Sequence, residues 1–96
     1  MSRYVLTEAA SRDVIEIYKQ GVQYFGEAQA DRYHNELHEA FSLLSSFPDI
    51  GKERPELSRP VRVHSREAHV IVYDVAPPGI RIVRVIHRSR DWQNLL

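Results

Sequence analysis

The second half of this 96-residue chain carries basic, imidazole and phenol side chains that could do chemistry. His87 follows an apolar run and stands beside Arg88 and Arg90. A histidine serves as a general acid or base near neutral pH, and arginines bind phosphate through paired hydrogen bonds. The full set is Arg62, His69, Tyr73, Arg84, His87, Arg88 and Arg90. No nucleophile motif accompanies these residues, so they indicate binding or acid–base chemistry.

A structural interpretation of the same residues is also open. Imidazole and aromatic side chains at alternating strand positions usually pack against a neighbouring layer, which favours packing for His69 and Tyr73. An aromatic residue next to charges, such as Trp92 after Arg88 and Arg90, is a common anchor of protein interfaces. For these last three residues, interface contact and simple solvation remain equally open.

His34 and His38 have the spacing that places two imidazoles on one face of a helix. The zinc protease motif requires a glutamate directly after the first histidine, but Asn35 occupies that position. No third ligand follows at catalytic spacing, and the chain has no cysteine. The scattered glycines form no phosphate-binding loop. We therefore predict no metal site and no cofactor, with both histidines on a solvated helix face.

The elements that must position these side chains begin with a β-hairpin. The apolar runs Ala68 to Val75 and Ile80 to His87 flank a Pro-Pro-Gly turn, which is typical of antiparallel strands. If Val75 faces Ile80, the oppositely charged Asp74 and Arg81 face each other. The predicted pairs are then Tyr73/Ile82 and Ile71/Arg84 on one face, and Val72/Val83 and Val70/Val85 on the other. Two apolar faces predict a central position in a sheet with helices on at least one side.

Arg84 is the exception in this hairpin, because it is a charge in the middle of a strand that should be buried. A buried guanidinium requires a partner. Arg84 is therefore either paired within the chain or directed at a ligand surface.

The preceding half of the chain predicts a short strand and two helices. Arg3 to Leu6 is extended, Thr7 is a suitable N-cap, and apolar residues recur at helical spacing on both sides of Gly26. The turn Pro48 to Gly51 ends the second helix. A charged connector, Lys52 to Pro60, leads to an edge strand at 61–64. The order β-α-α-β-β-β defines an α+β fold, with a helical hairpin packed on a twisted antiparallel sheet.

The length and charge of the chain limit the functions that it can have. A chain of 96 residues forms a single domain, here residues 1–96. No stretch reaches the roughly 20 apolar residues of a membrane span, so we expect a soluble, cytoplasmic protein without membrane contact. The net charge is zero, but residues 1–50 sum to −4 (four Lys/Arg, eight Asp/Glu) and residues 51–96 to +4 (nine and five). An anionic partner should therefore meet the sheet and the C-terminal segment.

Several segments together resemble the ParE branch of the RelE/ParE superfamily of bacterial toxins. They are Phe47-Pro48-Asp49-Ile50-Gly51, Arg54-Pro55-Glu56-Leu57, Arg62, His69-Val70-Ile71-Val72-Tyr73, Ile82-Val83-Arg84-Val85-Ile86-His87 and Arg90-Asp91, with residues 26–33 at the start of the second helix. The resemblance covers almost the whole chain and depends on their order and spacing. One departure is Arg59-Pro60, where many relatives have a glycine.

The resemblance implies the toxin of a type II toxin–antitoxin system. It implies a cognate ParD-like antitoxin, with a DNA-binding N-terminal domain and a helical C-terminal segment that wraps the toxin in a hetero-oligomer. ParE-like members are associated with inhibition of DNA gyrase, and RelE-like members with cleavage of messenger RNA on the ribosome. A neutral chain is poorly suited to clamping ribosomal RNA, so we favour gyrase inhibition without enzymatic activity or direct sequence-specific nucleic-acid binding.

The sequence hypotheses name three sets of residues. The antitoxin is expected to contact an apolar surface flanked by arginines, with Arg62, Tyr73, Arg84 and Arg88. Gyrase is expected to contact an exposed C-terminal segment, with Arg88, Arg90, Trp92, Leu95 and Leu96. The alternative, an mRNA endonuclease of the RelE type, would use His87, Arg62 and Arg90. A degenerate toxin that only binds its antitoxin is the third hypothesis.

Overall fold

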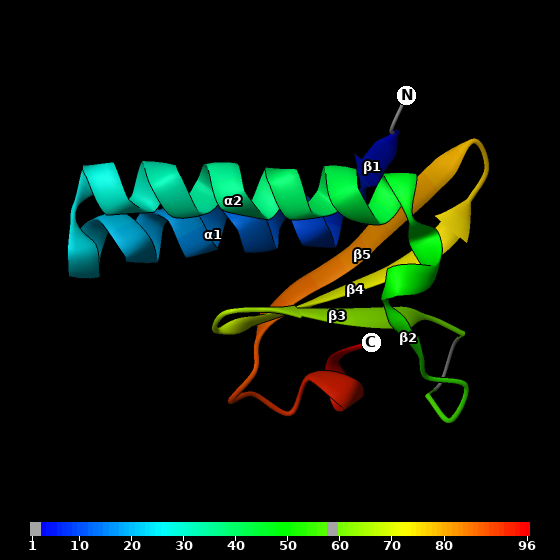
Figure 1. Cartoon of the computed structure of the whole chain (residues 1–96). Helices are drawn as coiled ribbons and strands as arrows, with labels where there is room; N and C mark the ends of the chain where they lie inside the picture. Colours follow the sequence, from blue (N-terminus) through cyan, green and yellow to red (C-terminus); the bar gives the residue numbers. More distant parts are fainter. Residues whose placement is uncertain (1–2, 58–59) are drawn as a thin grey trace.

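The computed structural model describes residues 3–57 and 60–96. Two helices, α1 (Glu8–Phe25) and α2 (Glu27–Ser46), lie on one face of a five-stranded sheet with the order β1-β5-β4-β3-β2 (Figure 1). The strands are β1 (Tyr4–Leu6), β2 (Lys52–Glu53), β3 (Arg62–Arg66), β4 (His69–Ala76) and β5 (Gly79–His87). Short 3-10 helices, η1 (Pro48–Ile50) and η2 (Trp92–Leu95), follow α2 and β5. The predicted α+β class and helical hairpin are confirmed.

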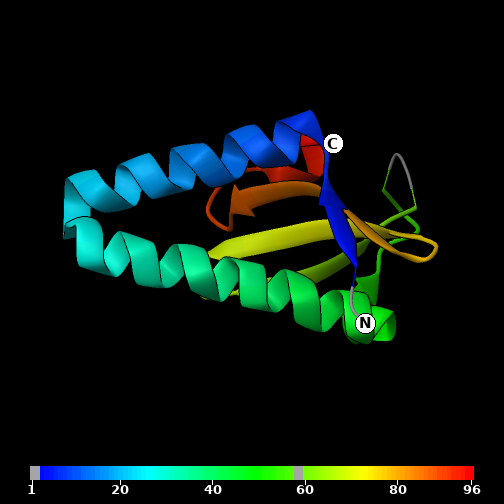
Figure 2. The ribbon, with the colours of Figure 1, turned by 90° about the horizontal axis from the view of Figure 1, so that it is seen from above.

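The helical hairpin forms at the predicted signals. The Thr7 hydroxyl accepts a hydrogen bond from the Ala10 amide at 3.0 Å, which caps the start of α1. Gly26 joins the helices with a φ of 88°, a conformation that favours glycine. Both helices run beyond the sheet at the end where they are connected (Figure 2).

The N-terminal strand β1 lies parallel to β5, and the other strand pairs are antiparallel. The prediction that the strand at 61–64 lies at the edge of the sheet is wrong, because β2 lies beyond β3 and pairs with Arg62 and Val63. The predicted charged connector thus contains a short strand, aligned by the hydrogen bond from the Arg54 amide to the Val61 carbonyl. At Arg59-Pro60, where the sequence departs from the family pattern, Arg59 lies outside the described residues.

The central β4–β5 hairpin begins in the predicted register. Val75 pairs with Ile80 and Tyr73 with Ile82, and the Arg81 guanidinium donates to the Asp74 carboxylate at 3.1 and 2.6 Å. The cross-strand ion pair therefore lies where opposite charges predicted it.

Beyond Tyr73 the predicted register is wrong. A β-bulge shifts the pairing, so that Val72 faces Arg84, Ile71 faces Val85, and Val83 is the additional residue. The bulge reverses the alternation along β5. Val85 consequently joins the core beneath the helices, where strict alternation would have placed Arg84.

Each face of the sheet has its own apolar core. The larger core lies between the helices and the sheet, and the smaller one lies on the opposite face beneath η2 (Figure 1). The larger contains Ala10, Val14, Leu37, Ala40, Phe41, Leu44, Ile71, Tyr73, Ile80, Ile82 and Val85. The smaller contains Val61, Val70, Val72 and Val83, with Leu57, Val63, Trp92 and Leu96 packed against it. In the described residues, no helix has the length and apolar character needed to cross a membrane.

The turn after α2 is fixed by the hydroxyl of Tyr73. This hydroxyl donates to the Pro48 carbonyl at 2.7 Å and accepts from the Gly51 amide at 2.8 Å. A β-carbon at position 51 would collide with the same hydroxyl. The glycine of this turn is therefore required by a buried contact rather than by its backbone angles.

We predict that Gly51→Ala lowers the free energy of unfolding by about 2 to 4 kcal/mol, because the added methyl group displaces Tyr73 and breaks both hydrogen bonds. Urea denaturation measures the change. The cost should be smaller when Tyr73→Phe has already removed the hydroxyl, and an unchanged denaturation midpoint for Gly51→Ala alone would contradict the assignment.

Candidate functional site

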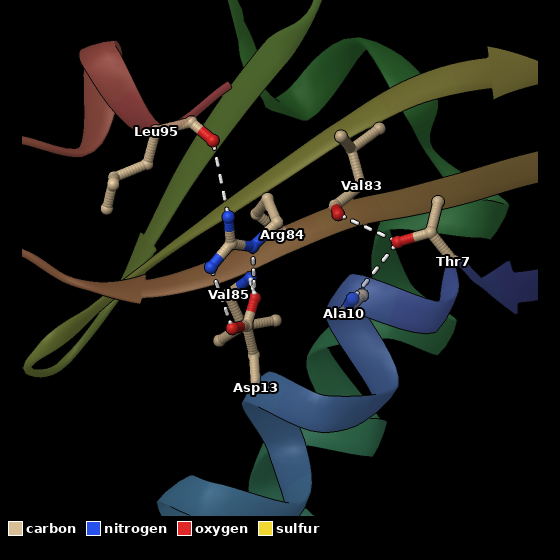
Figure 3. A network of polar contacts seen from close by, with 7 residues as sticks. All are labelled: Thr7, Ala10, Asp13, Val83, Arg84, Val85 and Leu95. Carbon is tan, nitrogen blue, oxygen red and sulfur yellow. Dashed lines mark hydrogen bonds and ion pairs between the residues drawn. The ribbon is translucent and has the colours of Figure 1, made fainter.

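Arg84 is paired within the chain (Figure 3). Its Nε and Nη2 donate to the two carboxylate oxygens of Asp13 on α1, at 2.7 and 3.0 Å. Asp13 Oδ2 also accepts from the Val85 amide at 2.9 Å, and Arg84 Nη1 donates to the Leu95 carbonyl at 3.2 Å. The hydrogen bond to Asp13 raises the pKa of Arg84. Of the two predicted roles for this charge, the structure shows the internal pair.

Two other residues of the expected antitoxin set also have structural partners. Tyr73 is fully buried, so its side chain has no surface to offer a partner, and this expectation is corrected. Arg62 donates to the Gly51 carbonyl at 2.7 Å and to Glu53 at 3.0 Å. Arg88, by contrast, is exposed.

The three residues of the nuclease alternative do not lie together. The Arg90 amide donates to the His87 carbonyl at 3.0 Å, so these two are neighbours. In the strand register, Arg62 of β3 lies opposite Tyr73 of β4. His87 of β5 lies opposite His69, at the other end of β4. Four residues of strand separate these pairs by roughly 13 Å. The structure therefore brings His87 and Arg90 together and places Arg62 apart from them.

The C-terminal segment is packed against the sheet, which corrects the expectation that its apolar side chains are exposed. Trp92 and Leu96 are partly buried on the smaller core, and the Arg54 guanidinium lies 5.3 Å from the Trp92 ring centre. The valines of this sheet face would otherwise be open to water. Arg88 and Arg90 remain exposed at the start of the segment.

Sequence reasoning missed a cluster of polar rings that joins α2 to the end of the sheet. The Tyr33 hydroxyl lies 2.7 Å from His69 Nδ1 and donates to the Arg66 carbonyl at 3.1 Å. The His69 and His87 rings are cross-strand neighbours with centres 5.4 Å apart. Burial raises the pKa of Tyr33 to about 12 and lowers that of His69 to about 4. His69 is therefore neutral at physiological pH.

The hydrogen bonds of His87 fix its tautomer. The Ser89 amide donates to His87 Nδ1 at 3.1 Å, and an amide cannot accept. In neutral His87 with this hydrogen bond the proton is therefore on Nε2, which can donate to a partner.

This cluster lies at one end of a groove of about 580 Å³ between the helical hairpin and the sheet. Its apolar wall comes from the hairpin, including Ile17, Tyr24 and Phe25, and its polar end from Tyr33, His69 and His87. The only sequence signal for the cluster of polar rings was the position of Tyr33 among the apolar residues that recur along α2. Nothing in the sequence links Tyr33 to His69.

His34 and His38 lie side by side on α2, with ring centres 4.7 Å apart. His38 Nδ1 is 2.8 Å from the Tyr4 hydroxyl, and burial lowers the pKa of His38. Both rings are partly buried rather than on a fully solvated face. Within residues 3–57 and 60–96, no three His, Cys, Asp or Glu side chains are grouped to hold a metal ion.

Comparison with known proteins relates most of the chain to one family. The family model described as ParE toxin of type II toxin-antitoxin system, parDE, matches residues 4–92. Toxin ParE1 of Mycobacterium tuberculosis is 34% identical over 91 residues, covering 94% of this chain and 93% of that protein. Toxin ParE1 of Caulobacter vibrioides is 31% identical over 93 residues, covering 95% and 94%.

The fold is also found among solved structures. The chromosomal ParDE TA system from P. aeruginosa contains a chain that superposes with a TM-score of 0.76, over 91% of this chain and 96% of that chain. The sequence identity is 24%, so this likeness concerns the fold alone.

We predict that His69 makes stability depend on pH. Its pKa is about 4 in the folded chain and 6.5 ordinarily, so between these values the unfolded chain binds a proton that the folded chain does not. The stabilisation is complete above pH 6.5 and is lost as the pH falls toward 4.

His69→Asn should therefore show a shallower decline in the free energy of unfolding between pH 6.5 and 4, as measured by urea denaturation. His38 and His64, whose pKa values burial also lowers, are present in both proteins and cancel in the comparison. Parallel pH curves for the two proteins would show that His69 does not titrate in this way.

Proposed function

This chain belongs to the ParE toxin family of type II toxin–antitoxin systems, and we propose that it stops bacterial growth by binding DNA gyrase. In this proposal a cognate ParD-like antitoxin binds the toxin and neutralises it. Toxin, antitoxin and gyrase all act in the cytoplasm.

The observation that carries the proposal is the separation of His87 from Arg62. The acid–base and phosphate-binding groups of a nuclease must act on one ribose-phosphate unit, but these residues lie roughly 13 Å apart along the sheet. The Arg62 side chain is also held by Gly51 and Glu53. A chain whose candidate catalytic groups are apart and internally bonded is better suited to act through a surface.

We assign the gyrase-binding surface to the start of the C-terminal segment. Arg88 and Arg90 are exposed there, while Trp92 and Leu96 anchor the segment on the sheet. Leu95 contributes its carbonyl to Arg84. In this assignment the arginines make the contact, and the apolar residues hold the backbone that presents them.

The antitoxin surface is proposed to overlap this one at Arg88. An acidic segment of the antitoxin would meet the basic half of the chain, which has a balance of +4. The side chains of Arg62 and Arg84 are each 21% exposed and form ion pairs within the chain. They therefore contribute little to antitoxin binding. Overlap at Arg88 would let the antitoxin exclude gyrase directly.

We predict that Arg88→Glu with Arg90→Glu weakens inhibition of gyrase supercoiling by about tenfold or more, because two contacts become repulsive. A purified supercoiling assay with increasing toxin measures this. The matched control, Arg12→Glu with Lys19→Glu, makes the same charge change on exposed positions of α1 and should inhibit like the wild type.

Undiminished inhibition by the arginine variant would remove this surface from the proposal. Absence of inhibition by the wild-type chain, together with cleaved transcripts in cells, would instead favour the nuclease. Normal growth on expression without antitoxin would mark a degenerate toxin.

A further inference from the structure

Ser89 lies at the tip of the turn that follows β5. The Arg90 amide donates to the His87 carbonyl at 3.0 Å, which places Arg88 and Ser89 at the two central positions of a four-residue turn. All four residues are exposed. A hydroxyl group at the tip of an exposed turn is accessible to an enzyme that modifies proteins.

The hydroxyl of Ser89 can be modified without loss of the turn. Its Oγ lies 2.7 Å from His87 Nδ1, and the Ser89 amide donates to the same nitrogen at 3.1 Å. When the hydroxyl proton is replaced, the amide still donates to the imidazole, and the His87 carbonyl keeps its hydrogen bond from Arg90. A group attached to Oγ therefore leaves the backbone of the turn in place.

The charges beside Ser89 favour a phosphate as that group. Arg88 and Arg90 flank it directly, and within the described part of the chain neither guanidinium forms an ion pair. The nearest carboxylate in the sequence, Asp91, accepts a hydrogen bond from Asn94 at 2.5 Å. A phosphoserine carries a charge of about −1.5 to −2 and three acceptor oxygens, which arginines bind through paired, charge-assisted hydrogen bonds.

The other exposed serines of residues 3–57 and 60–96 lack this arrangement. Ser46 has no arginine beside it in the sequence. Ser65 precedes Arg66, but that guanidinium lies 3.3 Å from the Glu36 carboxylate. Among the exposed serines in this part of the chain, Ser89 therefore has unpaired arginines on both sides.

We propose that Ser89 is phosphorylated by a protein kinase that uses a nucleoside triphosphate, and that Arg88 and Arg90 bind the phosphate. The Ser89 oxygen attacks the γ-phosphorus, whose bond to the β–γ bridging oxygen breaks. Nucleoside diphosphate leaves, and the hydroxyl proton passes to the base of the kinase. The consequence rests on the proposed function, because these arginines are the ones assigned to gyrase. Phosphorylation offsets their two positive charges and prevents them from contacting gyrase.

Phosphate transfer to the purified chain tests the site, with Mg-ATP, an arginine-directed serine kinase and mass spectrometry. The kinase is chosen because it phosphorylates a synthetic peptide of residues 85–93. The folded chain should gain one phosphate, and Ser89→Ala should abolish the gain. The matched control, Ser65→Ala, removes an exposed serine beside a paired arginine and should react like the wild type. A folded chain that stays unmodified while the peptide reacts, or a gain that Ser89→Ala leaves intact, would overturn the inference.

Phosphorus NMR tests the two arginines on chains that carry phosphoserine at position 89, incorporated during translation. The second acid dissociation constant of the phosphate should be about threefold or more larger than in Arg88→Gln with Arg90→Gln, because nearby guanidinium groups favour the dianion. Identical titration curves for the two proteins would show that these arginines do not bind the phosphate.

A gyrase supercoiling assay separates this inference from the proposed function. The chain with phosphoserine at position 89 should inhibit at least about tenfold less than the unmodified chain, because the phosphate occupies both arginines. Equal inhibition by the two proteins would overturn the regulatory role of Ser89. If the unmodified chain itself does not inhibit gyrase, the proposed function fails, and the phosphate transfer and the titration still decide whether Ser89 is a phosphorylation site.

Discussion

The ion pair between Arg84 and Asp13 connects three parts of the molecule at one point. The carboxylate of α1 accepts from the Arg84 guanidinium and from the Val85 amide, and the same guanidinium reaches the C-terminal segment through the Leu95 carbonyl (Figure 3). The bulge in β5 makes this possible, because it turns Arg84 out of the helix-side core while Val85 enters it. One charge in a central strand thus ties the helical layer, the sheet and the chain end together.

The arginines fall into two groups, those bonded within the chain and those exposed at its surface. Arg84 binds α1, Arg62 holds the turn at Gly51, and Arg54 lies over Trp92. Each is partly buried with a partner in the chain, where a guanidinium gains most from bidentate or stacked geometry. Arg88 and Arg90 are of the same residue type but are exposed at the end of β5. Burial, not residue type, distinguishes the cations that build the scaffold from those that a partner can reach.

Local signals predicted much of this fold, and contacts between distant residues account for what they missed. Thr7, Gly26 and the Pro-Pro-Gly turn act within a few residues, so the helices and the hairpin were predictable. The β-bulge was not, because strict alternation is the default and the groups that contact the bulge, Asp13 and the Thr7 hydroxyl, lie more than 70 residues away in the sequence. The same holds for the site: His87 and Arg90 are neighbours in sequence, whereas Tyr33 meets His69 only after α2 packs on the sheet.

The most direct test of this account is a double-mutant cycle on the central ion pair, with Asp13→Asn, Arg84→Met and both together, read as the free energy of unfolding in urea. We expect a coupling energy of about 1 to 3 kcal/mol, because the two side chains are only 15% and 21% exposed. Arg81→Met, at the more exposed ion pair with Asp74, should cost less than about 1 kcal/mol. Additive effects of the two central substitutions, or single costs no larger than that of Arg81→Met, would contradict the claim that this pair holds the layers together.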